Sequence, residues 1–487
     1  MKGTCFLFAA VISLSAACAT NPVTGKKQMS LLSEAEEIAI GQQQDLEIRR
    51  EMGVYDDANL QRYVSDIGQE LARHSHRPNL PWSFTIVDSS AINAFALPGG
   101  YIYVTRGLLA YLDDESELAG VLGHEIGHVT ARHAAQAYTR QAEANLGLMV
   151  LGIFVPSTQP FTDLSATGLG VLFLRNGREA ELEADRLGVE YGSGAGYDPT
   201  GVPRFLATLA RVSALSERGM PNWLSTHPDP GLRVTRAEPI AGKFVSADAT
   251  KVNHDPYLER IQGLVFGDNP KDGIVRGNEF LHPLLRIGVK FPDGWELTNT
   301  PEAVMAQEPG TQHFMVLQEV GQSQLRQGPG SQASRAIADT AIEAMRKAGY
   351  ASVDGTMQQI NGNDAYVGLY RGNAKGAGKV MMRAAHIAVG RQLYVVAGFA
   401  PEAEFTVVDR DIQSAMQTFR QLSMQEASNV RPNRIDFYVV RQGDSWQSIA
   451  ARQSKGFVNA ATLAIMNDRE VSAQPQPGDR VKIVVEG

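Results

Sequence analysis

The sequence predicts a multidomain α+β protein, and three observations support this prediction. The chain has 487 residues, and domains usually contain about 100–200 residues each. Its apolar residues follow a mainly helical period up to residue 245 and a mainly strand-like period from residue 256, and after residue 435 they form a short strand–helix–helix–strand pattern. We therefore expect a mainly α-helical domain with a small β-sheet at 31–245, an α/β domain at 256–425 and a small βααβ domain at 435–487.

Composition and charge exclude one class of function. Hydrophobic residues make up 43% of the chain and charged residues 20%, which is typical of globular proteins. The formal net charge of -8 at pH 7 argues against a nucleic-acid partner, because proteins that bind nucleic acids usually present a basic face.

The first 17 residues are expected to be a signal peptide. One lysine precedes an apolar run from Phe6 to Ala17, which is too short to span a membrane. The segment ending at Cys18 resembles a bacterial lipobox, although Ser15 stands where leucine is usual. The alternative is ordinary cleavage after Ala19.

We favour the lipobox, in which Cys18 becomes the lipidated first residue of the mature chain. Residues 18–30 would then be a tether, and Ala19 resembles the residue that directs lipoproteins to the outer membrane of Gram-negative bacteria. The expected location is the periplasm, with a lipid anchor in the outer membrane.

The helical domain contains predicted elements in a clear order. The pattern S-x-x-E from Ser33 predicts a helix start, and further helices are predicted at 58–74, 178–191 and 203–217. Residues 83–88 and 100–105 alternate as strands do, with a turn at 98–100 between them. A helix that starts near Asp113 follows.

This helix carries the sequence H-E-I-G-H. His124 and His128 are at i and i+4, so both can reach one Zn²⁺. Glu125 would face the open coordination position, where it can take a proton from water. Gly123 and Gly127 each cost the helix about 1 kcal/mol, and we expect them to let a neighbouring element approach closely.

A third metal ligand is expected from the acidic helix downstream. A catalytic zinc site usually has three protein ligands, and the candidates are Glu179, Glu181, Glu183 and Asp185. Glu181 and Asp185 share a helix face, so one can ligate the metal while the other orients a histidine. Spacing alone does not choose among the four.

Several motifs, in order over residues 21–239, resemble the zinc metallopeptidases of the HtpX and BepA type (peptidase family M48, gluzincins). The resemblance implies a zincin-type fold for 31–245, one Zn²⁺ held by His124, His128 and Glu181, Glu125 as general base and Asp185 as the residue that orients a ligand. The motifs are NPVTGKKQMSLLSEAEEIAIG, NAFALPGGYIYVTRGLL, HEIGH, ELEAD and STHPDPGLR.

The resemblance also implies residues that contact the substrate. The family's edge strand, which pairs with substrate backbone, corresponds to Asn93, Ala94 and Phe95. His227 would lie near the zinc, where it stabilises the oxyanion or occupies the open position in a resting state, and Arg233 would hold its loop. The residue pattern alone favours a surface position for His227.

Two further features are expected to have structural roles. His133 is neither i+3 nor i+4 from His128, so we interpret it as a solvated or satisfied histidine. The apolar runs at 146–155 and 166–174 are too short to span a membrane, and we expect buried helices. Contact with membrane or substrate is the alternative.

The remaining domains resemble two other families. Strands and two helices (334–349 and 402–422) are predicted in 256–425, whose FPDGW motif resembles PsbP-like folds. The tail resembles a LysM module, except that Trp446 stands where leucine or threonine is usual. LysM modules bind N-acetylglucosamine polymers, so peptidoglycan is an expected partner by resemblance.

These features together predict a zinc-dependent endopeptidase of the bacterial cell envelope. By resemblance, its substrates would be unfolded, misfolded or misassembled envelope proteins. Two alternatives come from other classes: a non-hydrolytic periplasmic chaperone or scaffold with a closed metal site, and a peptidoglycan-binding protein with a dormant peptidase domain. An intact Glu125 favours the enzyme, because a purely structural metal site does not need a general base.

Overall fold

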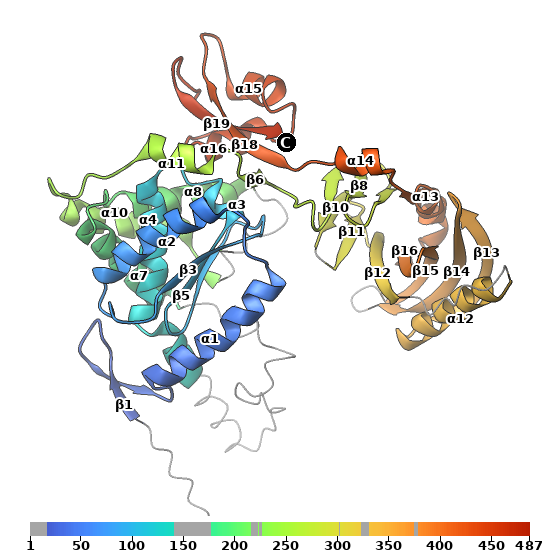
Figure 1. The fold of residues 1–487 in the computed structure, drawn as a ribbon, viewed down its shortest axis with the longest axis horizontal. Coiled ribbons are helices and arrows are strands. Elements are labelled where there is room, and N and C mark those ends of the chain that lie inside the picture. Colours follow the sequence, from blue (N-terminus) through green and yellow to red (C-terminus); the bar gives the residue numbers. More distant parts are fainter. Residues whose placement is uncertain are drawn as a thin grey trace, which may run out of the picture. The chain divides into compact units, whose positions relative to one another are not determined.

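Residues 17–140, 177–215, 223, 226–300, 302–322, 331–374 and 378–487 are described by the computed structural model. The chain divides into two units, one comprising Met1–Phe266 with Arg434–Val485 and the other Gly267–Asn433 with the last two residues (Figure 1). Both units mix helices and sheets, which confirms the α+β prediction. Residues 1–16 of the predicted signal peptide lie outside the described residues, and so do the apolar runs at 146–155 and 166–174.

The first described segment differs from the predicted tether. β1 (Ala17–Thr20) pairs antiparallel with β2 (Lys27–Ser30), so Cys18 lies opposite Met29. The turn is closed by Asn21, whose Oδ1 accepts hydrogen bonds from the backbone N–H groups of residues 23 and 24. Gly25 has a φ of 68°, which favours glycine. A local turn motif thus organises a segment whose polarity suggested a linker.

A three-stranded sheet supports one side of the candidate site. Its order is β3-β5-β4, with β3 parallel and β4 antiparallel to β5. The bounds are β3 (Ser83–Val87), β4 (Ala94–Leu97) and β5 (Tyr101–Thr105). The predicted turn at 98–100 therefore joins β4 to β5, and its assignment between the 83–88 and 100–105 strands was wrong, since parallel strands cannot be joined by a tight turn. β4 is an edge strand of this sheet.

Helices cover both faces of this sheet (Figure 1). α1 (Glu34–Glu51) begins with the predicted capping box of Ser33 and Glu36, and its Ile48 packs with Tyr101 and Tyr103. α2 (Ala58–Arg73) packs against the alternate side chains of the same strands, which belong to the main core of the unit. The strand period of two explains this division.

The H-E-I-G-H helix is the centre of the first unit. α4 (Glu115–Thr130) is buried over all 16 residues. A β-carbon at Gly123 would lie 3.0 Å from the carbonyl oxygen of Gly188, and one at Gly127 would lie 3.1 Å from Cα of Ala184. Both neighbours belong to α7 (Arg178–Gly194), so the glycines allow the close approach that the sequence predicted. Further helices of this unit include α3 (Arg106–Leu109), α8 (Gly201–Leu215), α10 (Pro230–Phe244) and α11 (His254–Ile261).

The C-terminal module has the predicted βααβ order and packs within the first unit. Its elements are β18 (Asn433–Val439), α15 (Trp446–Arg452), α16 (Ala460–Met466) and β19 (Arg480–Glu486), and β6 (Val265–Phe266) extends its sheet. Its apolar core is continuous with that of the helical domain. The buried Lys482 donates through Nζ to the carbonyl oxygen of Leu112 at 2.5 Å, just before α4, and Arg211 pairs with Asp468.

The second unit is built on a seven-stranded antiparallel sheet in the order β10-β11-β12-β16-β15-β14-β13. The predicted strands and the two predicted helices are all present in this unit. β13 was not predicted, because its first six residues are all exposed and carry few large apolar side chains. The bounds are β10 (Glu296–Asn299), β11 (Ala303–Gln307), β12 (Phe314–Gln322), β13 (Ala351–Ile360), β14 (Asn363–Ala374), β15 (Gly378–Val389), β16 (Gln392–Pro401), α12 (Ser331–Lys347) and α13 (Phe405–Gln417). A four-stranded sheet, β17-β9-β8-β7, and α14 (Met424–Ser428) complete it, with β7 (Ile274–Arg276), β8 (Glu279–His282), β9 (Ile287–Lys290) and β17 (Arg420–Gln421).

No helix among the described residues combines the length and apolar character needed to cross a membrane.

Candidate metal centre

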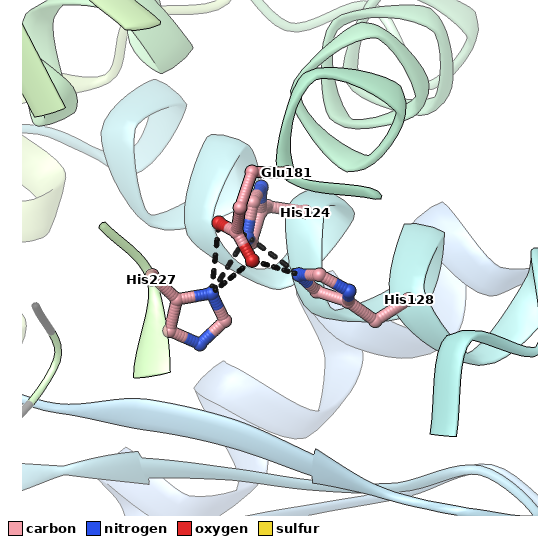
Figure 2. Close-up of side chains that lie close together, drawn as sticks. All are labelled: His124, His128, Glu181 and His227. Carbon is pink, nitrogen blue, oxygen red and sulfur yellow. Dashed lines mark hydrogen bonds and ion pairs between the residues drawn. The ribbon is translucent and has the colours of Figure 1, made fainter. Parts of the chain in front are cut away.

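Four side chains from three parts of the first unit meet in one buried group. His124 and His128 come from α4, Glu181 from α7 and His227 from the segment before α10. One ligand atom of each lies within 4.8 Å of the others, and Figure 2 shows the four side chains pointing toward one another. Such a group of three imidazoles and a carboxylate could hold a metal ion.

The donor atoms converge from one side. The Nε2 atoms of His124 and His128 are 3.0 Å apart. The carboxylate oxygens of Glu181 lie 3.6 Å from the first and 3.4 Å from the second of these nitrogens. Two ring nitrogens and one carboxylate therefore face a common point, and they belong to the three residues that the family resemblance implied as metal ligands. Among the four acidic candidates of α7, the structure brings Glu181 to this point.

The outer ring nitrogen of each histidine of α4 has its own partner. Nδ1 of His124 lies 2.9 Å from Oδ1 of Asp185, and Nδ1 of His128 lies 2.8 Å from Nδ1 of His133. His133 in turn contacts Glu183 through Nε2 at 3.2 Å. Such partners fix the orientation of a ligating ring.

Arg233 contacts the carboxylates of both Asp185 and Glu181 on α7. It donates to Asp185 through Nε and Nη2 at 2.8 and 2.6 Å, and its Nη1 lies 2.8 Å from Oε2 of Glu181. Burial alone raises the pKa of Asp185, but the charge of Arg233 and its hydrogen bonds outweigh this effect and hold the pKa at about 2. Burial also raises the pKa of Glu181, but the positive charge of nearby histidines outweighs this effect and lowers the pKa far below its usual range. Both carboxylates are therefore kept ionised in a buried environment.

Glu125 is buried beside this group and has no direct hydrogen bond at Oε1 from the described residues. Burial raises its pKa above the ordinary value, and the charge of His227 opposes this rise. Nε2 of His227 lies 3.7 Å from this oxygen. A carboxylate oxygen without a hydrogen bond beside a candidate metal site can accept a proton from water.

His227 is buried, with 3% of its surface exposed, so the surface position favoured by the residue pattern alone was wrong. Its Nδ1 lies 3.1 Å from both oxygens of Glu181 and 3.3 Å from Nε2 of His124. Its ring stacks on Trp223 at 4.6 Å between centroids. The hydrogen bond from the backbone N–H of His227 to the carbonyl oxygen of Trp223 helps to hold it inside.

Two neighbours of the site were missed from sequence. His133 lies beside the site although it is five residues from His128. This position is possible because α4 ends at Thr130 and Arg132 takes a left-handed φ of 59°, which turns the chain back. Trp223 had no motif to mark it. The signal available for His133 was its position in the sequence, five residues after His128.

The predicted substrate-contacting residues lie on the edge strand beside the metal-binding group. Ala94 and Phe95 belong to β4, and Asn93 precedes it with its Oδ1 buried and unpaired among the described residues. A recess of about 90 Å³ is lined by residues from Phe95 to Gly99 and by Glu125 and His128. The edge strand and the metal-binding group thus open onto the same space.

Two protein-family models match this chain. The model of peptidase family M48 matches residues 58–241, and that of the LysM domain matches residues 438–484. The chain therefore carries an M48 peptidase domain and a LysM domain, as the motifs predicted.

Similar proteins include proteases from bacteria and plants. The chain is 32% identical to the beta-barrel assembly-enhancing protease of Escherichia coli strain K12 over 255 residues, which are 50% of this chain and 52% of that protein. It is 34% identical to the mitochondrial metalloendopeptidase OMA1 of Arabidopsis thaliana over 206 residues, which are 42% of this chain and 40% of that protein. The chain thus spans about half the length of the curated relatives that it matches.

Among solved structures, the solution structure of cyanobacterial PsbP from Synechocystis matches 32% of this chain and 98% of its own chain, at 12% identity and a TM-score of 0.23. This score is too low to assign a fold. The PsbP-like fold of residues 256–425 remains a prediction.

Proposed function

We propose that this chain, which carries an M48 peptidase domain, is a zinc-dependent endopeptidase. The observation that supports this most directly is the convergence of His124, His128 and Glu181 in a buried site beside Glu125, whose Oε1 has no hydrogen bond from the described residues. Two imidazoles and one glutamate are a ligand set of catalytic zinc sites. The donor types and the buried outer partners of both rings fit this metal.

Zinc bound at this group would act as a Lewis acid toward the scissile carbonyl and acidify a water molecule. The chain's own residues supply the rest of the chemistry. Glu125 accepts a proton from the attacking water at Oε1 and passes it to the departing amide nitrogen. Asp185 and His133 hold the two histidine rings in place, and the free edge of β4 pairs with the backbone of an extended substrate.

His227 has two proposed roles in this mechanism. Its imidazole lies beside Glu181 and His124, where it would either be a further ligand of a bound metal in a resting state or donate a hydrogen bond to the oxyanion. Burial lowers the pKa of His227, but the negative charges of Glu181 and Glu125 outweigh this effect and raise the pKa.

Substrates and location rest on similarity alone. We propose unfolded or misassembled proteins of the bacterial envelope as substrates, because bacterial relatives are named beta-barrel assembly-enhancing proteases. Lipidation at Cys18 would anchor the chain at the outer membrane from the periplasmic side, and the LysM domain would contact peptidoglycan. Incorporation of labelled palmitate that is lost in Cys18→Ser tests the anchor, and co-sedimentation with peptidoglycan that N-acetylglucosamine oligomers prevent tests the glycan contact without deleting the packed module.

The enzyme assignment is tested by zinc content and by cleavage of unfolded casein. We expect about one zinc per chain in the parent and in Glu125→Gln, with cleavage only in the parent. Glu179→Gln, at an exposed position of α7, is the matched control and should behave as the parent. Zinc without cleavage in the parent and in His227→Ala would favour a scaffold, and absence of zinc from all variants would refute the metal site.

A further inference from the structure

The recess beside the metal-binding group has walls of a distinctive chemistry. Its volume is about 90 Å³, and α1 contributes Ile40 and Gln44 while β4 contributes Phe95 and Leu97. Glu37 and Arg132 also line it, but they are engaged with each other through a hydrogen bond of 2.7 Å. The wall that α1 and β4 form is therefore mainly apolar, and Glu37 and Arg132 compensate each other's charge.

Gln44 is a polar residue of this wall with an unpaired side-chain oxygen. It is 2% exposed, and its Oε1 is buried with no hydrogen-bond donor among the described residues. An amide oxygen that is buried without a partner is unfavourable for folding, and leucine would fill the same space without this penalty. An amide at this position is explained if a molecule that enters the recess supplies the missing donor.

The alternation of side chains along β4 indicates which part of a substrate enters the recess. Phe95 and Leu97 point to the face of the sheet that α1 covers, since both pack in one cluster with Ile48 of α1. A chain that pairs with the free edge of β4 presents alternate side chains to this same face. One of these side chains would enter the recess between α1 and β4, next to Glu125 and His128.

We propose that this recess is the pocket that determines substrate specificity, and that Gln44 selects a side chain with an apolar body and a hydrogen-bond donor at its tip, of which tyrosine is the best example. The proposal rests on the proposed peptidase function and adds the class of residue recognised beside the scissile bond. Lysine and arginine find no unpaired carboxylate on the α1 wall, because Glu37 already accepts hydrogen bonds from Arg77 and Arg132. Leucine and phenylalanine fill the volume but leave the amide oxygen unpaired.

The test compares peptides that differ at one residue. A cleavage site in casein is mapped by mass spectrometry, and peptides spanning it are made with tyrosine, phenylalanine or lysine at the position beside the scissile bond that most restricts cleavage. For the parent we expect kcat/KM with tyrosine to exceed that with phenylalanine by about 3- to 10-fold, the range of one neutral hydrogen bond. In Gln44→Leu this ratio should fall to about 1 or below, because the acceptor is lost while the apolar volume stays.

Gln43→Leu is the matched control, since Gln43 precedes Gln44 on α1 and is exposed. It should keep the tyrosine preference of the parent. A preference for tyrosine that is absent from the parent, or that survives in Gln44→Leu, would overturn the proposal.

A binding measurement separates this proposal from the proposed function. Fluorescence anisotropy gives the affinity of the tyrosine and phenylalanine peptides for Glu125→Gln, with and without Gln44→Leu. Selective binding that depends on Gln44, with no cleavage by the parent, would support the pocket and refute the peptidase. Cleavage of casein by the parent without any effect of Gln44 on selectivity would support the peptidase and refute the pocket.

Discussion

Gly123 and Gly188 face each other where α4 and α7 cross. A β-carbon built on Gly188 would lie 3.0 Å from the backbone nitrogen of His124, and one built on Gly123 would lie 3.0 Å from the carbonyl oxygen of Gly188. The two helices carry His124, His128 and Glu181, three of the four side chains of the metal-binding group. The spacing of these ligands therefore depends on two residues that have no side chain.

Gly188→Ala should lower zinc affinity at least tenfold, by analogy with the loss of groups that position ligands. The added β-carbon presses on backbone atoms of α4, so the helices must separate and Glu181 moves away from His124. Zinc affinity is measured by competition with a chelator. Gly192→Ala is the control, because no atom lies within 4 Å of a β-carbon there, and it should leave affinity unchanged while stabilising α7 by up to about 1 kcal/mol. Equal affinities in the two variants would contradict the argument.

His133→Ala should weaken zinc binding by about 10- to 100-fold while the fold is kept. The variant removes the only partner that the described residues offer to Nδ1 of His128 at 2.8 Å, so the ring loses its fixed orientation. Circular dichroism checks the fold, and chelator competition measures the affinity. His74→Ala removes a histidine whose side chain contacts Glu70 outside the site, and its affinity should match the parent.

Arg233→Lys should also weaken zinc binding, again by about 10- to 100-fold. The guanidinium of Arg233 contacts Asp185 with two nitrogens and Glu181 with the third, and an ammonium group cannot reproduce this fork. Arg236→Lys, at an exposed position of the same helix, is the control. A parent-like affinity in Arg233→Lys would show that charge alone suffices at this position.

Local patterns predicted much of the fold because they are determined within a few residues. The capping box at Ser33 and the i,i+4 pair of His124 and His128 need only one helical turn. The sequence could equally predict that Gly123 and Gly127 lie at a close contact, since a buried helix gains nothing else from them.

Other features depend on the tertiary fold and could not be derived in this way. The choice of Glu181 among four acidic residues is made by the packing of α4 on α7, and only the family resemblance anticipated it. The inward position of His227 depends on the stacking with Trp223. β4 is too short to show a strand period, so the sequence did not predict its antiparallel pairing with β5.

The contact between the LysM module and the start of α4 makes stability depend on acid pH. Nζ of Lys482 lies 3.4 Å from Oδ1 of Asp113. Burial alone raises the pKa of Asp113, but the charge of Lys482 and the contact with His254 lower it from the ordinary 3.8 to about 2. A carboxyl with a lowered pKa in the folded state stabilises the fold above its unfolded pKa. This stabilisation, about 2 kcal/mol, should be lost as the pH falls from about 4 to about 2.

Lys482→Met should destabilise the first unit by about 2–3 kcal/mol at pH 7, because it leaves a largely buried carboxylate without its cation. It should also flatten the acid dependence, since the pKa of Asp113 then returns toward its ordinary value. The free energy of unfolding is followed by tryptophan fluorescence in a Trp295→Phe background, where the remaining tryptophans all belong to the first unit. Lys26→Met, the same change at an exposed residue, should keep both the stability and the slope of the parent. An unchanged slope between pH 4 and pH 2 in Lys482→Met would mean that another group carries the acid sensitivity, and that the module is held to α4 by its apolar core alone.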